Sequence, residues 1–241
     1  MRPLLRTTRS ADALDSLVAA VEDFLAEDDT PYNDPFCGVA EAPFLLELRH
    51  CNLNDSNPHF INFYKTVKSG DFLKNNRWLI SRGTDLNSWA RNRTRFNELL
   101  TKGQTNTVEA AQLTFYLSHI GRNFRLGSTG TLISRNDPDA ELPDIDWDAA
   151  AALMQDWTLS NHSEYNAFNV DADAPLVINA PQVYRLQWDG DAWDPATHGE
   201  LLAWLESRPG KVIVFHPPSR PIQALYAHWP ENNRVFHLLP G

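Results

Sequence analysis

Polar side chains stand directly after two apolar segments near the start of the chain, and their types suit the binding of a nucleotide-like ligand. Asp34 opens the run Asp34-Pro-Phe-Cys-Gly38, and Asp55 ends the segment Cys51-Asn-Leu-Asn-Asp55. A glycine after a strand lets the backbone turn tightly toward a ligand, and an acid at the end of the next strand can accept hydrogen bonds from both ribose hydroxyls. Asp55 can also cap a helix near Asn57, and the two roles are compatible.

Apolar periodicity predicts the elements that hold these side chains. Residues 14–25 repeat at helical intervals behind Ser10 as N-cap, and a strand, helix, strand unit of the nucleotide-binding kind follows over residues 32–55. The predicted strands are 32–38, 51–55, 175–179, 211–215 and 234–239, and the predicted helices beside them are 14–25, 44–48, 198–206 and 220–229. The fold class is therefore predicted to be α/β.

The middle of the chain is predicted to be a helical insertion. Helical periodicity covers residues 59–68 and 108–120, and an arginine-rich stretch, 89–100, lies between them. We expect an α/β domain of residues 1–56 and 146–241, interrupted by a basic helical insert of residues 57–145. The acid-rich stretch 137–148 lacks the regular spacing of a calcium loop and is predicted to be a solvated linker.

Charge is distributed unevenly along the chain. The formal net charge is −10, yet residues 60–135 hold twelve Lys or Arg against four acids and carry +8, which leaves −18 for the rest. An acidic protein would ordinarily not be expected to bind a polyanion. A basic segment in an acidic body is either an ordinary basic surface or a nucleic-acid footprint, and the pattern favours the footprint.

Composition limits the other classes of protein. Hydrophobic residues make up 42% of the 241 residues, with eight Trp and twelve Phe, which is enough to bury a substantial core and argues against wholesale disorder. Apolar runs are far shorter than the roughly 20 residues of a membrane span, and no secretory signal is visible, so we expect a cytoplasmic protein. Cys37 and Cys51 are expected to be reduced and buried, and the histidines show no metal-binding spacing.

Four motifs, in order, resemble those of the Dam-type DNA adenine methyltransferases. Asp34-Pro-Phe-Cys-Gly38 is similar to the family's first cofactor motif, an acid followed by Pro-Phe-x-Gly-x-Gly, and Asp55 stands where the family has its ribose-binding acid. The run Asn57-Pro-His-Phe-Ile-Asn-Phe-Tyr-Lys-Thr-Val-Lys68 resembles the family's Asn-x-x-Leu-Ile-x-Leu-Tyr-x-x-Val-Lys helix. Arg93-Thr-Arg-Phe-Asn97 and Glu109-Ala-Ala-Gln-Leu-Thr-Phe-Tyr-Leu117 continue the likeness, which is collinear over nearly the whole chain.

This resemblance implies a Rossmann-like methyltransferase sheet with an inserted helical DNA-recognition domain, in a bacterial cell or a phage-infected host. It implies S-adenosylmethionine as the cofactor and duplex DNA as the partner. The cofactor-binding residues that it implies are Asp34, Pro35, Phe36, Gly38, Ala40 and Asp55. The DNA-binding residues that it implies are Arg91, Arg93, Arg95, Asn97, Asn123 and Arg125.

The family's catalytic signature, Asp-Pro-Pro-Tyr or Asn-Pro-Pro-Tyr, corresponds here to Asn179-Ala-Pro-Gln182. The first side chain and the next carbonyl accept hydrogen bonds from the adenine amino group, while the aromatic ring stacks on the flipped base. The resemblance thus implies catalytic roles for Asn179, Ala180 and Pro181. Gln182 cannot stack, which costs about 1–3 kcal/mol unless Tyr184 substitutes.

Two further departures affect the cofactor pocket. The family's opening Trp-Ala-Gly-Gly-Lys motif, which folds over the cofactor, is replaced by Arg6-Thr-Thr-Arg-Ser10. In the first motif Ala40 stands in place of the second glycine, and Glu41 adds an anion near the expected cofactor carboxylate. We therefore expect weak or absent cofactor binding and impaired, lost or altered methyl transfer.

Three functions stay open at this point. The favoured one is a divergent Dam-type protein whose insert binds duplex DNA, because a fold can persist for stability after its pocket decays. The first alternative is an active adenine-N6 methyltransferase that uses Asn179, with Tyr184 stacking on the base. The second alternative is a non-catalytic subunit or a DNA mimic, whose acidic surface binds a protein partner.

Overall fold

The computed structural model describes residues 1–25, 31–74, 77–121, 132, 135–137, 139–182, 193–229 and 234–240 of the chain. Its helices are α1 (Ala11–Leu25), α2 (Glu41–Leu45), α3 (Pro58–Lys68), α4 (Leu86–Thr101), α5 (Val108–Ile120), α6 (Trp147–Leu153), α7 (Pro195–Glu206) and α8 (Arg220–Leu225), with a 3-10 turn η2 (Tyr165–Ala167). Its strands are β1 (Tyr32–Asp34), β2 (Cys51–Asn54), β3 (Thr158–Ser160), β4 (Leu176–Asn179), β5 (Val212–His216) and β6 (Arg234–Leu238).

The strands form two small parallel sheets, ordered β1-β2-β3 and β4-β5-β6. In the first sheet Tyr32 pairs with Cys51, and in the second Leu176 pairs with Val212. Parallel strands need long crossover connections, and helices supply several of them here. The predicted α/β class is therefore confirmed.

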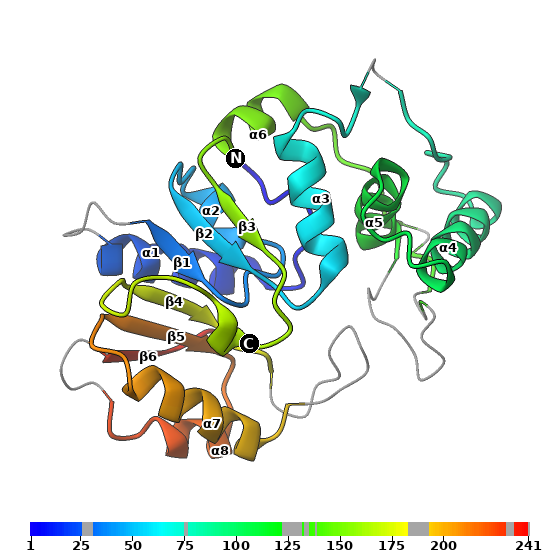
Figure 1. The fold of residues 1–241 in the computed structure, drawn as a ribbon. Helices are drawn as coiled ribbons and strands as arrows, with labels where there is room; N and C mark the ends of the chain where they lie inside the picture. The colour runs from blue at the N-terminus through cyan, green and yellow to red at the C-terminus, as the bar shows by residue number, and fades with distance from the viewer. Residues whose placement is uncertain are drawn as a thin grey trace.

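The two sheets meet edge to edge, with β1 beside β4 (Figure 1). The buried Asn33 side chain donates to the carbonyl of Pro175 at 2.9 Å and to that of Pro31 at 2.8 Å. At the carboxyl ends of the same strands, the Asn179 amide donates to the Asp34 carboxylate at 2.8 Å. Side-chain hydrogen bonds thus connect two strands, β1 and β4, that are far apart in the sequence.

Helices cover both faces of the β4–β6 sheet, because successive side chains of a strand point to opposite faces. Val177 and Ile213 belong to the same buried cluster as Leu17 of α1. The strand residues on either side of Val177 and Ile213 point to the opposite face of the sheet. They pack in a second cluster with α7, which lies with α8 along one side of this sheet (Figure 1). This second cluster includes Leu176, Ile178, Val212, Val214, Leu201 and Leu205. Such double coverage is typical of parallel sheets.

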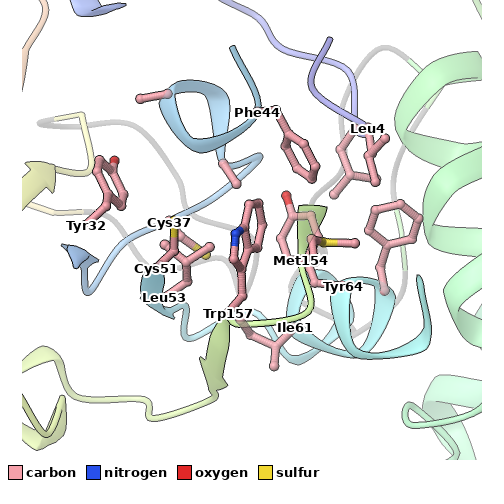
Figure 2. Close-up of a cluster of buried hydrophobic side chains, with 14 of the residues drawn as sticks. Leu4, Tyr32, Cys37, Phe44, Cys51, Leu53, Ile61, Tyr64, Met154 and Trp157 are labelled. Carbon is pink, nitrogen blue, oxygen red and sulfur yellow. The ribbon is translucent and has the colours of Figure 1, made fainter. Parts of the chain in front are cut away.

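Trp157, just before β3, lies at the centre of the larger core. Figure 2 shows its indole among side chains from α2, β2 and α3 and from the residue after α6, including Phe44, Leu53, Ile61 and Met154. Its ring nitrogen donates to the carbonyl of Leu48 at 2.8 Å, so this large side chain is both buried and hydrogen-bonded.

Helices α4 and α5 pack against each other in a third cluster and lie apart from the strands (Figure 1). Trp89 and Phe96 of α4 meet Leu113, Tyr116 and Leu117 of α5 there. The residues of α3, by contrast, are buried in the cluster that contains β1 and β2. The predicted division into residues 57–145 and the remainder stays a prediction.

Most of the predicted elements are confirmed, with shifted ends. Ser10 caps α1, because its hydroxyl accepts from the backbone NH of Ala13 at 3.3 Å. The helix predicted at 44–48 is wrong in extent, since α2 ends at Leu45, and the helix predicted at 220–229 ends at Leu225.

Two elements, α6 and β3, were not expected, because both are short and α6 begins inside the acid-rich stretch. The linker prediction for residues 137–148 is therefore wrong at its end. Asp146 caps α6 by accepting from the NH of Ala149 at 2.9 Å.

Cys37 and Cys51 are free and buried, as expected. No helix in the described part of the chain is long and apolar enough to cross a membrane.

Glu47, two residues after the end of α2, adopts a conformation that favours glycine. The NH of Leu48 donates to the carbonyl of Pro43 at 3.0 Å, and the NH of Glu47 donates to the carbonyl of Phe44 at 3.3 Å. These are the two bonds of a Schellman cap, in which Glu47 has φ of 52°. Left-handed backbone costs a non-glycine residue about 1–2 kcal/mol.

We expect Glu47→Gly to raise the midpoint of thermal unfolding by roughly 2–4 °C, because glycine removes this strain and the exposed ion pair with the N-terminal amine contributes little. The matched control is Glu22→Gly at an exposed position within α1, where glycine should lower the midpoint. A fall in the midpoint for both variants would contradict this interpretation of the cap.

Candidate functional site

The loop after β1 has the compact backbone that its glycine motif predicts. The Asp34 carboxylate accepts from the NH of Phe36 at 2.8 Å, and Gly38 has φ of 50°. Ala40, at the place of the second glycine of the resemblance, also adopts a left-handed conformation with φ of 51°. The hydroxyl of Tyr64 on α3 donates to the Gly38 carbonyl at 3.0 Å. The loop therefore keeps a glycine-like backbone at both positions, although only one of them is glycine.

Asp55 fastens this loop to the start of α3. One carboxylate oxygen accepts from the NH of Gly38 and the other from the NH of Asn57, each at 2.8 Å. Asn57 itself caps α3 by accepting from the NH of His59 at 3.0 Å. Burial raises the pKa of Asp55 to about 6, although the two NH bonds oppose that rise. Each oxygen keeps a further acceptor position, so a structural role and a ligand-binding role are compatible.

The carboxyl ends of β1 and β4 bring Asp34 and Asn179 together. The Asn179 amide nitrogen and the Tyr32 hydroxyl both donate to one Asp34 oxygen, at 2.8 and 3.1 Å. Asp34 is 1% exposed, and burial raises its pKa to about 7 against the lowering effect of these bonds. The predicted first catalytic residue and the predicted cofactor acid are thus direct hydrogen-bond partners.

The N-terminal segment adds a cation to this network. The Arg9 guanidinium donates to the side-chain oxygen of Asn179 at 3.2 Å and to the Glu41 carboxylate at 2.6 Å. The Thr7 hydroxyl also donates to Glu41, which is 8% exposed. Glu41 is therefore an anion paired inside the molecule, and the segment that replaces the family's opening motif supplies its partners.

The rest of the predicted catalytic tetrapeptide follows directly. Ala180 is buried, while Pro181 and Gln182 are half-buried. The Pro181 carbonyl lies 3.0 Å from the ring nitrogen Nε2 of His198, and burial lowers the pKa of His198 to about 4. The neutral imidazole thus fixes this turn by a hydrogen bond to its main chain. Tyr184, the predicted stacking residue, lies outside the described residues.

The predicted DNA-binding residues divide into two kinds. Arg91 is exposed on α4, and the guanidinium of Arg93 lies 5.2 Å from the centre of the Trp89 ring. Arg95 is held by carboxylates, with two bonds of 2.7 Å to Glu109 on α5 and one of 3.0 Å to Glu98.

The side-chain oxygen of Asn97 accepts from the NH of Leu132 at 2.7 Å. An open cavity of about 520 Å³ borders α4 beside Arg91 and Arg95. Asn123 and Arg125 lie outside the described residues.

Sequence reasoning missed Arg9 and His198 at this site. Arg9 offered one usable signal, because Arg9 and Glu41 have opposite charges and both stand where the chain departs from the motifs that it otherwise resembles. His198 lies in the first turn of α7, and its bond to the Pro181 carbonyl gave no periodic signal.

The raised pKa of Asp34 predicts a specific pH dependence. The pKa of Asp34 is near 3.8 in the unfolded chain and about 7 in the folded protein. Between these two pH values the folded protein holds up to one more proton than the unfolded chain. The stability that this group contributes is therefore fully present below pH 3.8 and is lost as the pH rises toward 7. We therefore compare the free energies of unfolding of the wild type and of Asp34→Asn. The wild-type value minus the variant value should fall by up to about 1.4 kcal/mol per pH unit across this pH window. Urea unfolding from pH 4 to pH 8 measures this, and a flat or rising difference would contradict the assignment.

No protein-family model matches this chain, and no curated protein is significantly similar to it. The likeness to Dam-type methyltransferases therefore rests on the sequence motifs, and what it implies about function stays a proposal.

Proposed function

We propose that this chain is a divergent Dam-type protein that binds duplex DNA through its basic helical segment, with adenine methyl transfer reduced, lost or altered. The observation that supports this most is the convergence of Asp34 and Asn179 at the ends of β1 and β4, with Asp55 just beyond the end of β2. In doubly wound sheets, ligands bind in the crevice outside the carboxyl ends of the strands. Residues that the resemblance assigns to the cofactor and to the base thus lie where this class of fold binds ligands.

The strand arrangement supports a Rossmann-like assignment of the sheet. Counted across the contact between β1 and β4, the strands follow the order β3-β2-β1-β4-β5-β6. This order is the one found in dinucleotide-binding folds, and it reverses direction between β1 and β4. Asp34 and Asn179 stand at that reversal.

The contact between Arg9 and Asn179 supports the reduced activity. Methyl transfer to adenine requires the Asn179 oxygen to accept from the amino group of the base, and that oxygen already accepts from Arg9. An adenine must therefore share this oxygen with the Arg9 guanidinium or displace it. A shift of the base by even 1 Å from the reactive geometry costs about 100-fold in rate. Robust N6-methyladenine in duplex DNA, abolished by Asn179→Ala, would instead establish the active-enzyme alternative.

We expect DNA binding to depend on Arg91 and Arg93 of α4. We expect Arg91→Ala with Arg93→Ala to weaken binding of a duplex at low salt and to reduce the slope of log affinity against log salt by up to about 2, because each phosphate contact releases counterions. Arg95→Ala should change this slope less, since its guanidinium already pairs with Glu98 and Glu109. Fluorescence anisotropy over a salt series measures both effects.

The matched control for the double variant is Arg49→Ala with Arg220→Ala, which removes the same charge from exposed positions of the α/β part. Equal losses for both double variants would show that net charge alone matters. Absence of duplex binding by the wild type at low salt would contradict the proposal and favour the acidic-surface alternative.

Cofactor binding is expected to be weak, and the Glu41–Arg9 pair gives a sharp test of the reason. Glu41→Gln keeps a hydrogen-bonding side chain beside Thr7 but frees the Arg9 charge to attract a carboxylate. With Ala40→Gly in addition, we expect S-adenosylmethionine to bind more tightly in calorimetry. Dissociation in the low micromolar range from the unmodified protein, about −7 to −8 kcal/mol, would refute the weak-binding hypothesis.

A further inference from the structure

Three aromatic rings pack together near the carboxyl end of β1, and the rings themselves have no part in the site described so far. Phe36 follows β1, Tyr165 begins η2, and Trp193 lies two residues before the start of α7. Their ring centroids are 5.7 Å apart for Phe36 and Tyr165, 5.3 Å for Phe36 and Trp193, and 6.1 Å for Tyr165 and Trp193. Each ring thus contacts the two others, although the residues come from three distant segments.

The three rings are half-buried, unlike core rings such as Phe44 and Trp157, which are almost fully buried. They pack on the second core cluster from its edge. Tyr165 also contacts Trp204 of α7 with centroids 5.2 Å apart. The group is therefore anchored on one side and open on another.

This group borders the tetrapeptide Asn179–Gln182 through two connections. The NH of Phe36 bonds to Asp34, whose other oxygen accepts from Asn179. Trp193 contacts the ring of His198 at 5.2 Å, and His198 bonds to the Pro181 carbonyl. The backbone of Phe36 is thus linked to Asn179 through Asp34, and the ring of Trp193 is linked to Pro181 through His198.

We propose that Tyr165 and Trp193, backed by Phe36, form a stacking site for a planar nucleobase. The inference rests on the proposed function and deepens it, because it supplies the aromatic surface that Gln182 cannot provide. Every base has a π-face that stacks on aromatic rings, and Tyr and Trp offer such faces with little conformational freedom. The amide of Asn179 and the main chain of the tetrapeptide can pair with the edge of a base when that edge replaces or shares their present partners Arg9, Asp34 and His198, whereas a methylated cation in an aromatic cage offers no such edge.

The probe is a short oligothymidine strand with one central 2-aminopurine, compared with the same strand carrying an abasic position. We expect the full-length protein to quench the 2-aminopurine and to bind that strand about ten-fold more tightly than the abasic one, as stacking on aromatic rings predicts. Trp193→Leu and Tyr165→Leu keep an apolar side chain but remove the ring. Each should abolish most of the ten-fold preference for the 2-aminopurine strand over the abasic strand. Trp193→Phe should retain part of it.

Trp229→Leu, in the same core cluster but outside the three rings, is the control and should leave the preference unchanged. Equal binding of both strands by the wild type would overturn the proposal, as would an undiminished preference in the folded leucine variants. A third outcome would also overturn the proposal. If millimolar tetramethylammonium abolishes the preference for the 2-aminopurine strand, and the protein does not quench the 2-aminopurine fluorescence, the rings form a cage for a cation.

Failure of this proposal is distinguishable from failure of the proposed function. Duplex binding that depends on Arg91 and Arg93, without a base preference, would leave the DNA-binding proposal standing and reject the stacking site. A base preference without duplex binding would do the reverse.

Discussion

The hydrogen bond between Asn179 and Asp34 is the interaction on which the rest of the site depends. It joins the carboxyl ends of β1 and β4, while the Asn33 side chain joins the same strands near their beginnings. Because these strands belong to different three-stranded ladders, the two sheets stay in register through side chains. The position of the Asp34 loop relative to the Asn179 tetrapeptide follows from this junction.

Polar groups at the site have partners within the chain. Both oxygens of Asp55 accept main-chain NH groups, Glu41 accepts from Thr7 and Arg9, and Asn179 has a partner at each end of its amide. A buried polar group without a partner costs more than a hydrogen bond gains, so such saturation stabilises the fold. A ligand that needs these atoms must compete with the protein's own bonds or use the acceptor positions that remain, which is the physical reason to expect weak chemistry at the ends of β1 and β4.

Regular elements that carry their own local signal were predictable from the sequence, whereas short or irregular elements decided by tertiary contacts were not. The apolar spacing of residues 108–120 and the capping hydroxyl of Ser10 identified α5 and α1, since each carries its own local signal. The three-residue β3 carries too few residues for a period, and its pairing with β2 is decided by tertiary contacts. The convergence of Asp34 with Asn179 was implied by the resemblance, whereas the pairing of Arg9 with Glu41 depends on how the N-terminal segment lies over the loop.

Duplex DNA is proposed to contact α4 and also to reach the carboxyl ends of β1 and β4. Hydrogen–deuterium exchange of the protein with and without a duplex tests it most directly, because it reports on every segment at once. Slower exchange is predicted for peptides covering residues 86–101 and for those covering residues 34–40 and 179–182. Protection confined to other parts of the chain, or no protection at a duplex concentration that binds, would contradict the account.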